Sequence, residues 1–350
     1  MGKYRVLIVD DSPLVRRMIA KVLEPERDME VVGMAADPYQ ARDLIQKTKP
    51  DILTLDIEMP RMDGLTFLKI LMEKHPMPVI VLSSLSQENS IYACRALEEG
   101  AADVLAKPRS SHSIGETGAI LAGRIRSILR HGKADHARLP AASLPAIKTE
   151  VKLGTALAGR KWDPSQIILM GASTGGPPAL KRVLSGLPAN LPGICLVQHM
   201  PAFITQAFAE RLDADCALHV REAKDGDLVE PGQVLLAPGD YHMTLQKQMN
   251  QFQVRLDQSA KVCYQRPSVD VLFKSALPYA SRRMLAVILT GMGSDGAAGM
   301  LDLKNAGART IAQDEATSVV YGMPRAAADI GAVREVVPLE KVAASILRSV

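Results

Sequence analysis

Two sets of polar residues in this sequence have the types and spacing that group-transfer chemistry requires. The first set, in the first third of the chain, combines carboxylates, a hydroxyl and an ammonium group: Asp10, Asp11, Asp56, Ser83 and Lys107. Clustered carboxylates bind a hard divalent cation such as Mg²⁺, and the cation helps a carboxylate attack phosphorus by neutralising phosphate charge. A hydroxyl and a lysine can hold the transferred phosphoryl oxygens. The set therefore predicts a phosphoacceptor site.

Each member of this set follows a predicted strand. Asp10 and Asp11 follow the first strand, Asp56 the third, Ser83 the fourth and Lys107 the fifth. A single aspartate after a strand is more often a helix cap or a turn residue. Because the carboxyl ends of parallel strands meet at one edge of a sheet, five such residues in order favour one shared site.

The second set begins with Ser173, in the segment MGASTGGPPAL. This segment follows a predicted strand and opens a predicted helix, and its glycines allow a tight turn. The residues from Gly171 to Gly175 fit the pattern G-x-S-x-G, and N–H groups at a helix start can stabilise developing negative charge. A Gly-rich turn that only binds an anion is the alternative interpretation, whereas a P-loop is not supported because no G-K-[ST] follows.

A nucleophilic serine needs a general base. His199, at the end of the apolar segment ICLVQHM, is the first candidate among the seven histidines. His242, in APGDYHM, is the second candidate because it also follows a predicted strand, and His219 is assigned to the face of a strand.

The base in turn needs an orienting acid. Asp295 is the first candidate, because it lies in TGMGSDGAAG directly after the apolar segment LAVIL. Three other aspartates suit turns or helix starts and are weaker candidates: Asp225, Asp240 and Asp270. The order serine, histidine, aspartate differs from the order serine, acid, histidine of α/β-hydrolases, so that fold is disfavoured despite the short motif.

Residues 1–128 alternate short apolar runs with amphipathic stretches. Strands are predicted at Tyr4–Val9, Val31–Ala35, Ile52–Leu55, Val79–Ser83 and Val104–Ala106, and helices at Leu14–Leu23, Ala41–Lys47, Leu65–Lys74, Ile91–Glu98 and Ile120–Leu129. This alternation predicts an α/β domain with a five-stranded parallel sheet in the flavodoxin-like order.

Residues 163–350 form a second alternating unit. Strands are predicted at Ile167–Met170, Ile194–Gln198, Val234–Ala237 and Leu285–Leu289, helices at Pro178–Ser185, Thr205–Leu212, Val269–Tyr279 and Ala298–Asn305, and a hairpin at Tyr241–Leu256. The pattern predicts a doubly wound, mostly parallel, three-layer α/β domain with some antiparallel decoration. Residues 129–162 lose the hydrophobic period and contain Pro140 and Pro145, which predicts an interdomain linker.

The composition gives no nucleic-acid or membrane signal. The 42 basic and 38 acidic residues leave a net charge of +4, and no basic stripe with interleaved aromatics occurs, so no nucleic-acid partner is expected. The N-terminal MGKYRVLIVDDSP is no signal peptide, and apolar runs such as Leu285–Leu289 are too short for a bilayer, which predicts a cytoplasmic protein without membrane insertion. The four cysteines form no C-x-x-C pair, and Cys94 and Cys195 are expected to be buried thiols.

Residues 1–128 resemble the receiver domains of response regulators. The resemblance rests on VDDSP around Asp10, LDIEMPRMDG from Leu55 to Gly64, LSS at 82–84 and LAKP at 105–108. Val104 stands where that family often has an aromatic switch residue, so an aromatic relay of the phosphorylation signal is not expected.

The receiver resemblance implies specific roles. It implies that a histidine kinase phosphorylates Asp56 and that Ser83 and Lys107 contact the phosphoryl group. It also implies a set of Mg²⁺ ligands, the last through its backbone carbonyl: Asp10, Asp11, Asp56 and Glu58.

Residues from about 163 to 348 resemble the catalytic domain of the chemotaxis receptor methylesterases, the CheB family. The matching segments are GASTGGP, VQHMP, LLAPGDYH, RPSVDVLF, LTGMGSDGA and VVYGMP. The resemblance implies that Ser173 is the nucleophile, His199 its general base and Asp295 the orienting acid. It also implies that the Met292 backbone N–H helps to bind the oxyanion, and it places Thr174 beside the nucleophile.

By resemblance, the substrate is a glutamate γ-methyl ester on the cytoplasmic helical bundle of a chemoreceptor, and methanol is released. Deamidation of receptor glutamines is the implied second activity, and the esterase step needs no cofactor. The unphosphorylated receiver is expected to block Ser173 until Asp56 is phosphorylated. Three alternatives stay open: a receiver joined to a ligand-binding domain that cleaves nothing, a hydrolase of small esters, and a receiver with a nucleic-acid output.

Overall fold

The chain divides into two compact units, Met1–Ser143 and Leu144–Val350, and each is described here by itself. The structure is a computed structural model that describes residues 2–84, 87–107, 114–131, 162–163, 165–249 and 251–350. Nearly all of the predicted linker, residues 129–162, lies outside the described residues.

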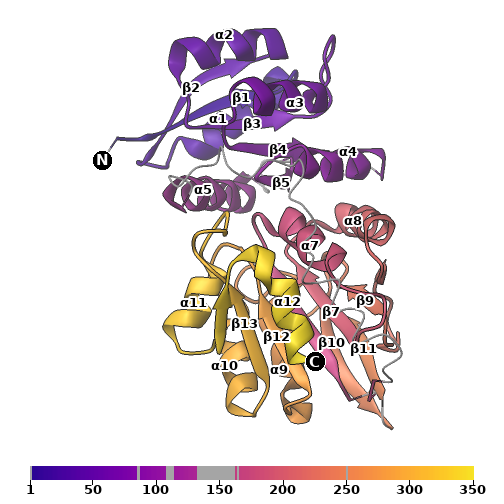
Figure 1. The fold of residues 1–350 in the computed structure, drawn as a ribbon. Coiled ribbons are helices and arrows are strands. Elements are labelled where there is room, and N and C mark those ends of the chain that lie inside the picture. Colours follow the sequence, from indigo (N-terminus) through magenta and orange to yellow (C-terminus); the bar gives the residue numbers. More distant parts are fainter. Residues whose placement is uncertain (1, 85–86, 108–113, 132–161, 164, 250) are drawn as a thin grey trace. The chain divides into compact units, whose positions relative to one another are not determined.

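The first unit is an open α/β sheet (Figure 1). Its elements in chain order are β1 (Tyr4–Val9), α1 (Pro13–Leu23), β2 (Met29–Ala35), α2 (Pro38–Thr48), β3 (Ile52–Asp56), α3 (Gly64–Lys74), β4 (Val79–Ser83), α4 (Gln87–Glu98), β5 (Asp103–Ala106) and α5 (Ile114–His131). The five strands are ordered β2-β1-β3-β4-β5, and all of the pairs are parallel. The predicted five-stranded parallel sheet is therefore confirmed.

Local sequence explains how the helices of this unit begin. Ser12 caps α1, where its side chain accepts a hydrogen bond from the Val15 N–H. Asp37 caps α2 in the same way, through the N–H groups of Tyr39 and Gln40. Capping satisfies N–H groups that have no partner inside the helix, so each of these helices can begin within a few residues of the preceding strand.

The second unit is a larger three-layer α/β domain. Its elements in chain order are β6 (Ile167–Ala172), α7 (Gly176–Ser185), β7 (Gly193–Gln198), α8 (Ala202–Asp215), β8 (His219–Glu222), β9 (Gln233–Leu236), β10 (His242–Gln248), β11 (Gln251–Asp257), α9 (Val269–Ala276), the 3₁₀ turn η2 (Leu277–Tyr279), β12 (Met284–Ile288), α10 (Ala297–Asn305), β13 (Arg309–Gln313), α11 (Met323–Asp329), β14 (Glu335–Val337) and α12 (Leu339–Ser349).

Seven parallel strands form the main sheet of this unit, in the order β14-β13-β12-β6-β7-β9-β8. Helices α7, α8 and α12 lie on one face, and α9, α10 and α11 lie on the other (Figure 1). The hairpin predicted at Tyr241–Leu256 is present as the antiparallel pair β10–β11, which packs against α9. The central strands β6, β7 and β12 are buried along their whole length, as expected for a sheet covered on both faces.

Two features of this unit differ from the sequence prediction. The helix predicted at Val269–Tyr279 ends at Ala276 and continues as the 3₁₀ turn η2, because Pro278 lacks the N–H that an α-helix needs. Strands β13 and β14 and helices α11 and α12, which follow α10 in the chain, were not predicted.

Two further predictions concern the cysteines and membrane-spanning segments. Cys94 and Cys195 are buried, as predicted. Within the described ranges, every helix is too short or too polar to cross a bilayer.

Candidate functional site

The carboxyl ends of β1, β3 and β5 bring together an ion-paired cluster in the first unit. Lys107, directly after β5, places its Nζ 2.9 Å from Asp10 Oδ2 and 2.7 Å from Asp56 Oδ2. Both carboxylates are almost completely buried, and the lysine side chain is 15% exposed. One cation thus faces two carboxylates in a site with little access to water.

Burial changes the acidity of this cluster. It raises the pKa of Asp56 to about 6, because the hydrogen bond and the charge of Lys107 only partly offset the loss of solvation. Burial also disfavours the charged form of Lys107, but the hydrogen bonds to Asp56 and Asp10 outweigh it and raise the pKa of the ammonium group. The site therefore keeps a permanent positive charge beside a carboxylate that ionises reluctantly.

The other predicted members of the set lie around this cluster. Carboxylate oxygens of Asp10, Asp11 and Asp56 lie within 4.8 Å of one another. The Glu58 N–H donates to Asp56 Oδ1 at 3.2 Å, which keeps the Glu58 main chain beside the Asp56 carboxylate. Ser83 is buried, and its carbonyl accepts the Lys107 N–H at 2.9 Å.

This donor set fits a hard divalent cation. Carboxylate oxygens are the ligands that Mg²⁺ prefers, and a bound cation would stabilise the charge of the desolvated Asp56 carboxylate. Val104, in the place of an aromatic switch residue, is 4% exposed within β5.

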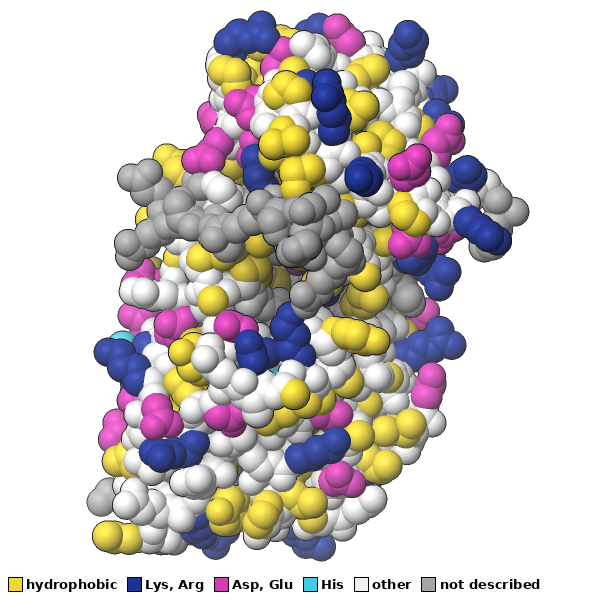
Figure 2. Space-filling view, turned by 180° about the vertical axis from the view of Figure 1, so that it is seen from behind, with side chains coloured by type: hydrophobic (Ala, Val, Ile, Leu, Met, Phe, Trp, Pro, Cys, Tyr) yellow, Lys and Arg dark blue, Asp and Glu magenta, His cyan; other side chains and the backbone are white. Residues whose placement is uncertain are grey.

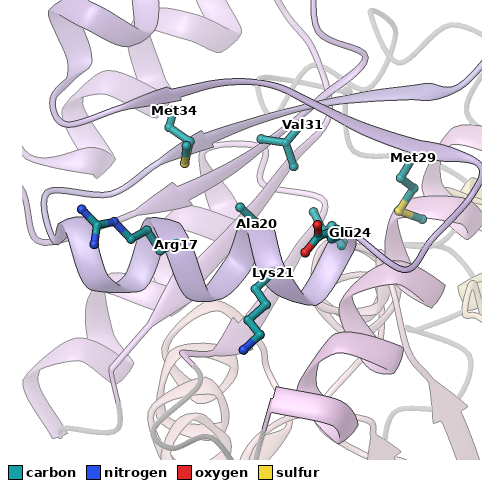
Figure 3. A pocket seen from close by; sticks show the side chains of 8 residues that line it. Arg17, Ala20, Lys21, Glu24, Met29, Val31 and Met34 are labelled. Carbon is teal, nitrogen blue, oxygen red and sulfur yellow. The ribbon is translucent and has the colours of Figure 1, made fainter.

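An open pocket elsewhere on the first unit does not belong to this cluster. Val31 and Met34 of β2 face α1 there, and Arg17 and Lys21 extend from that helix (Figure 3). Asp10, Asp56 and Lys107 are not among the residues that line it.

In the second unit, Ser173 lies in a tight turn between β6 and α7. Its N–H donates to Thr290 O at 3.0 Å, and its carbonyl accepts the Gly176 N–H at 2.7 Å. Gly175 has a φ of +73°, and a Cβ there would come within 2.5 Å of Val319. The turn therefore requires glycine, as the G-x-S-x-G pattern predicts.

His199 follows β7, the strand next to β6. Its Nε2 lies 2.7 Å from Asp295 Oδ2, and both side chains are buried. Since a carboxylate only accepts hydrogen bonds, Nε2 carries the proton and Nδ1 keeps its lone pair. His199 Nδ1 is buried, and among the described residues it has no hydrogen-bond partner. That nitrogen is the one that is free to accept a proton.

Asp295 lies between β12 and α10, where its carboxylate is held by four donors. Burial alone would raise the pKa of Asp295, but the hydrogen bond from His199 and the donors at the start of α9 lower it below its usual value. The charged carboxylate can therefore hold the imidazole and stabilise an imidazolium.

Met292, the predicted oxyanion donor, lies in the loop after β12. A Cβ on its neighbour Gly291 would come within 2.7 Å of the Ser173 Cβ, so this loop packs directly against the turn that holds Ser173. The Gly291 N–H donates to Val320 O at 3.0 Å. Thr174 is buried beside Ser173, and its carbonyl accepts the Thr290 hydroxyl at 2.9 Å.

The alternative bases and acids have other partners. Both nitrogens of His242 face the main chain, with Nδ1 3.2 Å from Ser268 N and Nε2 3.1 Å from Ala260 O. Asp270 accepts the Gly299 N–H at 2.7 Å. The two remaining aspartates hold loops: Asp225 accepts the Leu256 N–H, and Asp240 pairs with Arg266.

Gln198 and Ser268 support the site but were not predicted from the sequence. Gln198 Nε2 donates to Ser173 O at 2.9 Å and to His199 O at 3.1 Å, which links the segments that follow β6 and β7. A polar side chain in a fully buried strand was the signal for Gln198. Ser268 donates to Asp295 Oδ1 at 2.7 Å. Its position before an apolar helix was the signal of a cap, but its partner is distant in sequence.

Comparisons with known proteins agree with both units. The family model of the CheB methylesterase matches residues 168–346, and that of the response regulator receiver domain matches residues 6–117. The chain is 48% identical over 352 residues to protein-glutamate methylesterase/protein-glutamine glutaminase 2 of Syntrophus aciditrophicus, with 100% of both chains covered. It is 47% identical over 349 residues to the protein of the same name from Pseudomonas aeruginosa, with 98% of this chain and 96% of that protein covered.

A solved structure also matches the second unit. The CheB methylesterase catalytic domain of Thermotoga maritima is 41% identical, with a TM-score of 0.52, and the match covers 53% of this chain and 98% of that one. Together with the full-length relatives, this match shows that the chain belongs to the CheB methylesterase family of hydrolases, with a response regulator receiver domain in front of the catalytic domain.

Proposed function

We propose that the second unit hydrolyses glutamate γ-methyl esters on chemoreceptors, releases methanol and also deamidates receptor glutamines. The observation that carries this proposal is the 2.7 Å contact between His199 Nε2 and Asp295, which leaves the buried Nδ1 as a base near the Ser173 turn. Family membership adds the substrate, since the relatives are named protein-glutamate methylesterase/protein-glutamine glutaminase.

The mechanism assigns one role to each member of the triad. His199 Nδ1 takes the Ser173 proton while the oxygen attacks the ester carbonyl, and Asp295 stabilises the imidazolium. The tetrahedral oxyanion is bound by the Met292 N–H, a kind of donor typically worth about 2.7–4 kcal/mol. The imidazolium protonates the departing methanol, and a glutamyl ester of Ser173 remains.

Water completes the cycle. His199 removes a proton from the water as it attacks the glutamyl ester, and then returns that proton to Ser173 as glutamate leaves. A glutamine side chain has the same shape, and its reaction differs only in that ammonia leaves in place of methanol.

The first unit is proposed to control this reaction through phosphorylation. A histidine kinase would donate a phosphoryl group to Asp56, with Ser83 and Lys107 contacting the phosphoryl oxygens. Asp10, Asp11, Asp56 and the Glu58 carbonyl would hold Mg²⁺, which neutralises phosphate charge when bound. The 2.7 Å pair between Lys107 and Asp56 supports the role of the lysine.

The decisive test is methanol release from methylated chemoreceptor fragments by the full chain. Ser173→Ala is expected to lower kcat by roughly 10⁴-fold or more, because the nucleophile is lost. Ser185→Ala, at the other end of α7, is the matched control and should keep wild-type activity. Methanol release that survives both Ser173→Ala and His199→Ala would refute the roles proposed for these residues. No methanol release by the wild-type chain would favour a ligand-binding domain that cleaves nothing. Equal rates on small methyl esters and receptor fragments would refute the receptor substrate.

A further inference from the structure

The carboxylate of Asp295 is held on both oxygens by the segment that opens α9. Oδ1 accepts the Ser268 hydroxyl at 2.7 Å and the Asp270 N–H at 3.0 Å. Oδ2 accepts the Val269 N–H at 2.7 Å, in addition to His199. Only one of the three α9 donors is a side chain, and Ser268 is fully buried, so its hydroxyl serves Asp295 and not solvent.

His242 holds the main chain of Ser268, whose N–H lies 3.2 Å from its Nδ1. A backbone N–H only donates and a carbonyl only accepts, so the contacts with Ser268 N and Ala260 O require a bare Nδ1 and a protonated Nε2 on His242. The imidazole is thus a neutral spacer between two main-chain segments. Its side chain is fully buried, which leaves Ser268 little freedom to turn away from Asp295.

We propose that Ser268 and His242 are positioning residues for the triad: His242 fixes Ser268, and the Ser268 hydroxyl orients the Asp295 carboxylate so that Oδ2 faces His199. Neither residue touches the substrate in this proposal. The inference rests on the proposed esterase function. It also gives a role to His242, the second candidate base, whose hydrogen bonds go to Ser268 and Ala260.

Loss of the hydroxyl has a predictable effect on proton binding. The titratable groups that face Asp295 are His199 after β7, Cys263 in the loop before α9, and Asp270 on α9 itself, with Lys274 3.6 Å from Asp270. With one donor fewer, the Asp295 charge is less stabilised, so the His199–Asp295 pair binds a proton more readily. The acid limb of kcat/KM, which reports protonation of this pair in the free enzyme, should move to higher pH.

The test is the pH profile of methanol release by the full chain with Ser268→Ala. We expect kcat to fall about ten- to hundredfold at neutral pH, as for loss of a hydrogen bond to a charged group, while KM for the receptor fragment stays within about twofold. Ser268→Thr keeps a hydroxyl and is expected to restore most of kcat.

Matched variants distinguish the effect of Ser268→Ala on the orientation of Asp295 from a general loss of stability. Ser275, near the other end of α9, accepts the Leu245 N–H at 2.9 Å and donates to Leu272 O at 2.7 Å, so Ser275→Ala removes two partly buried hydrogen bonds that do not involve Asp295. It is expected to lower stability without moving the acid limb. His242→Asn keeps an acceptor near the Nδ1 position and should retain the wild-type limb, whereas His242→Leu should shift it as Ser268→Ala does.

Three outcomes would overturn the proposal: a wild-type kcat in Ser268→Ala, a wild-type acid limb in both Ser268→Ala and His242→Leu, or an equal shift in Ser275→Ala. Ser173→Ala is assayed in parallel. If the wild type releases methanol and Ser173→Ala does not, the esterase function stands whatever Ser268→Ala does.

Discussion

At the scale of single residues, two buried aspartates show how partners decide acidity. Asp56 has one strong cationic partner, and burial raises its pKa to about 6. Asp295 is equally buried, but four donors hold it, and its pKa is lowered. The difference suits their proposed tasks, because Asp56 must accept a phosphoryl group with help from a cation, whereas Asp295 must stay charged beside His199.

The raised pKa of Asp56 has a consequence for stability. Between pH 4 and pH 6 the folded receiver binds more protons than the unfolded chain, so without a divalent cation its stability should fall as pH rises through this window. Asp56→Asn cannot ionise and should escape this loss. The variant should match the wild type near pH 4 and exceed it by up to about 3 kcal/mol at pH 7.

The measurement is hydrogen–deuterium exchange of β3 peptides in the full chain with a chelator present. Addition of Mg²⁺ should reduce the difference in stability between Asp56→Asn and the wild type at pH 7, because the cation stabilises only the charged carboxylate. If this difference in stability is the same at pH 4 and pH 7, ionisation of Asp56 does not destabilise the receiver.

Residue types and strand ends were enough to predict which residues to consider, but not always which to choose. His199 and His242 both follow strands, and the sequence ranked them only by their neighbours. The choice depends on contacts made between segments 96 residues apart in the chain, such as His199 with Asp295. The same holds for Ser268, whose capping role was visible locally and whose contact with Asp295 was not.

At the scale of elements, the bounds of buried strands with continuous apolar runs were predicted to within two residues. Strands β13 and β14, which lack such runs, were not predicted. Strand β13 reads RTIAQ, and β14 has only three residues, so neither has a strand signature of its own. Both become strands by pairing outward from β12. Helix α12 does have a helical period, with Val342, Ala343, Ile346 and Leu347 buried, and could have been predicted.

The loop before α9 contains a strained turn. Val262 and Gln265 exchange two main-chain hydrogen bonds, and the residues between them, Cys263 and Tyr264, have φ values of +50° and +62°. Such a turn favours Asn-Gly, and a non-glycine residue in this region costs about 1–2 kcal/mol. Tyr264 is 87% exposed, so packing of its side chain offsets little of that strain.

Replacing this pair with Asn-Gly should therefore stabilise the catalytic unit. For the double variant Cys263→Asn/Tyr264→Gly we expect a gain of about 1 kcal/mol, since relief of strain exceeds the added freedom of the unfolded chain. Trp162, the single tryptophan, is buried in this unit, so its fluorescence can follow urea unfolding. Cys263→Ala keeps the strained backbone and should show no gain, and a loss of stability in the double variant would contradict the strain argument.

At the scale of the whole molecule, the distribution of charged side chains bears on the alternative of a nucleic-acid output. On the face shown in Figure 2, Lys and Arg side chains are interspersed with Asp and Glu side chains over both units, with no broad area of one sign. The overall charge of +4 agrees with this mixture. A nucleic-acid output would need a concentrated basic surface to neutralise phosphates.

If one chain carries both the proposed phosphoacceptor cluster and the proposed triad, its esterase activity should respond to a phosphodonor. In the presence of Mg²⁺, a small-molecule phosphodonor should raise methanol release by the full chain. Asp56→Asn should remove this response while keeping the basal rate, because the proposed triad residues all lie in the other unit.

Lys107→Ala should still be phosphorylated on Asp56, but its methanol release should rise only weakly, since the phosphoryl group loses its cationic partner. Ser173→Ala should show the converse, with normal phosphorylation of Asp56 and no methanol. A rate that rises equally in wild type and Asp56→Asn would mean that the donor acts elsewhere, and an unchanged wild-type rate would separate the receiver from control of the esterase.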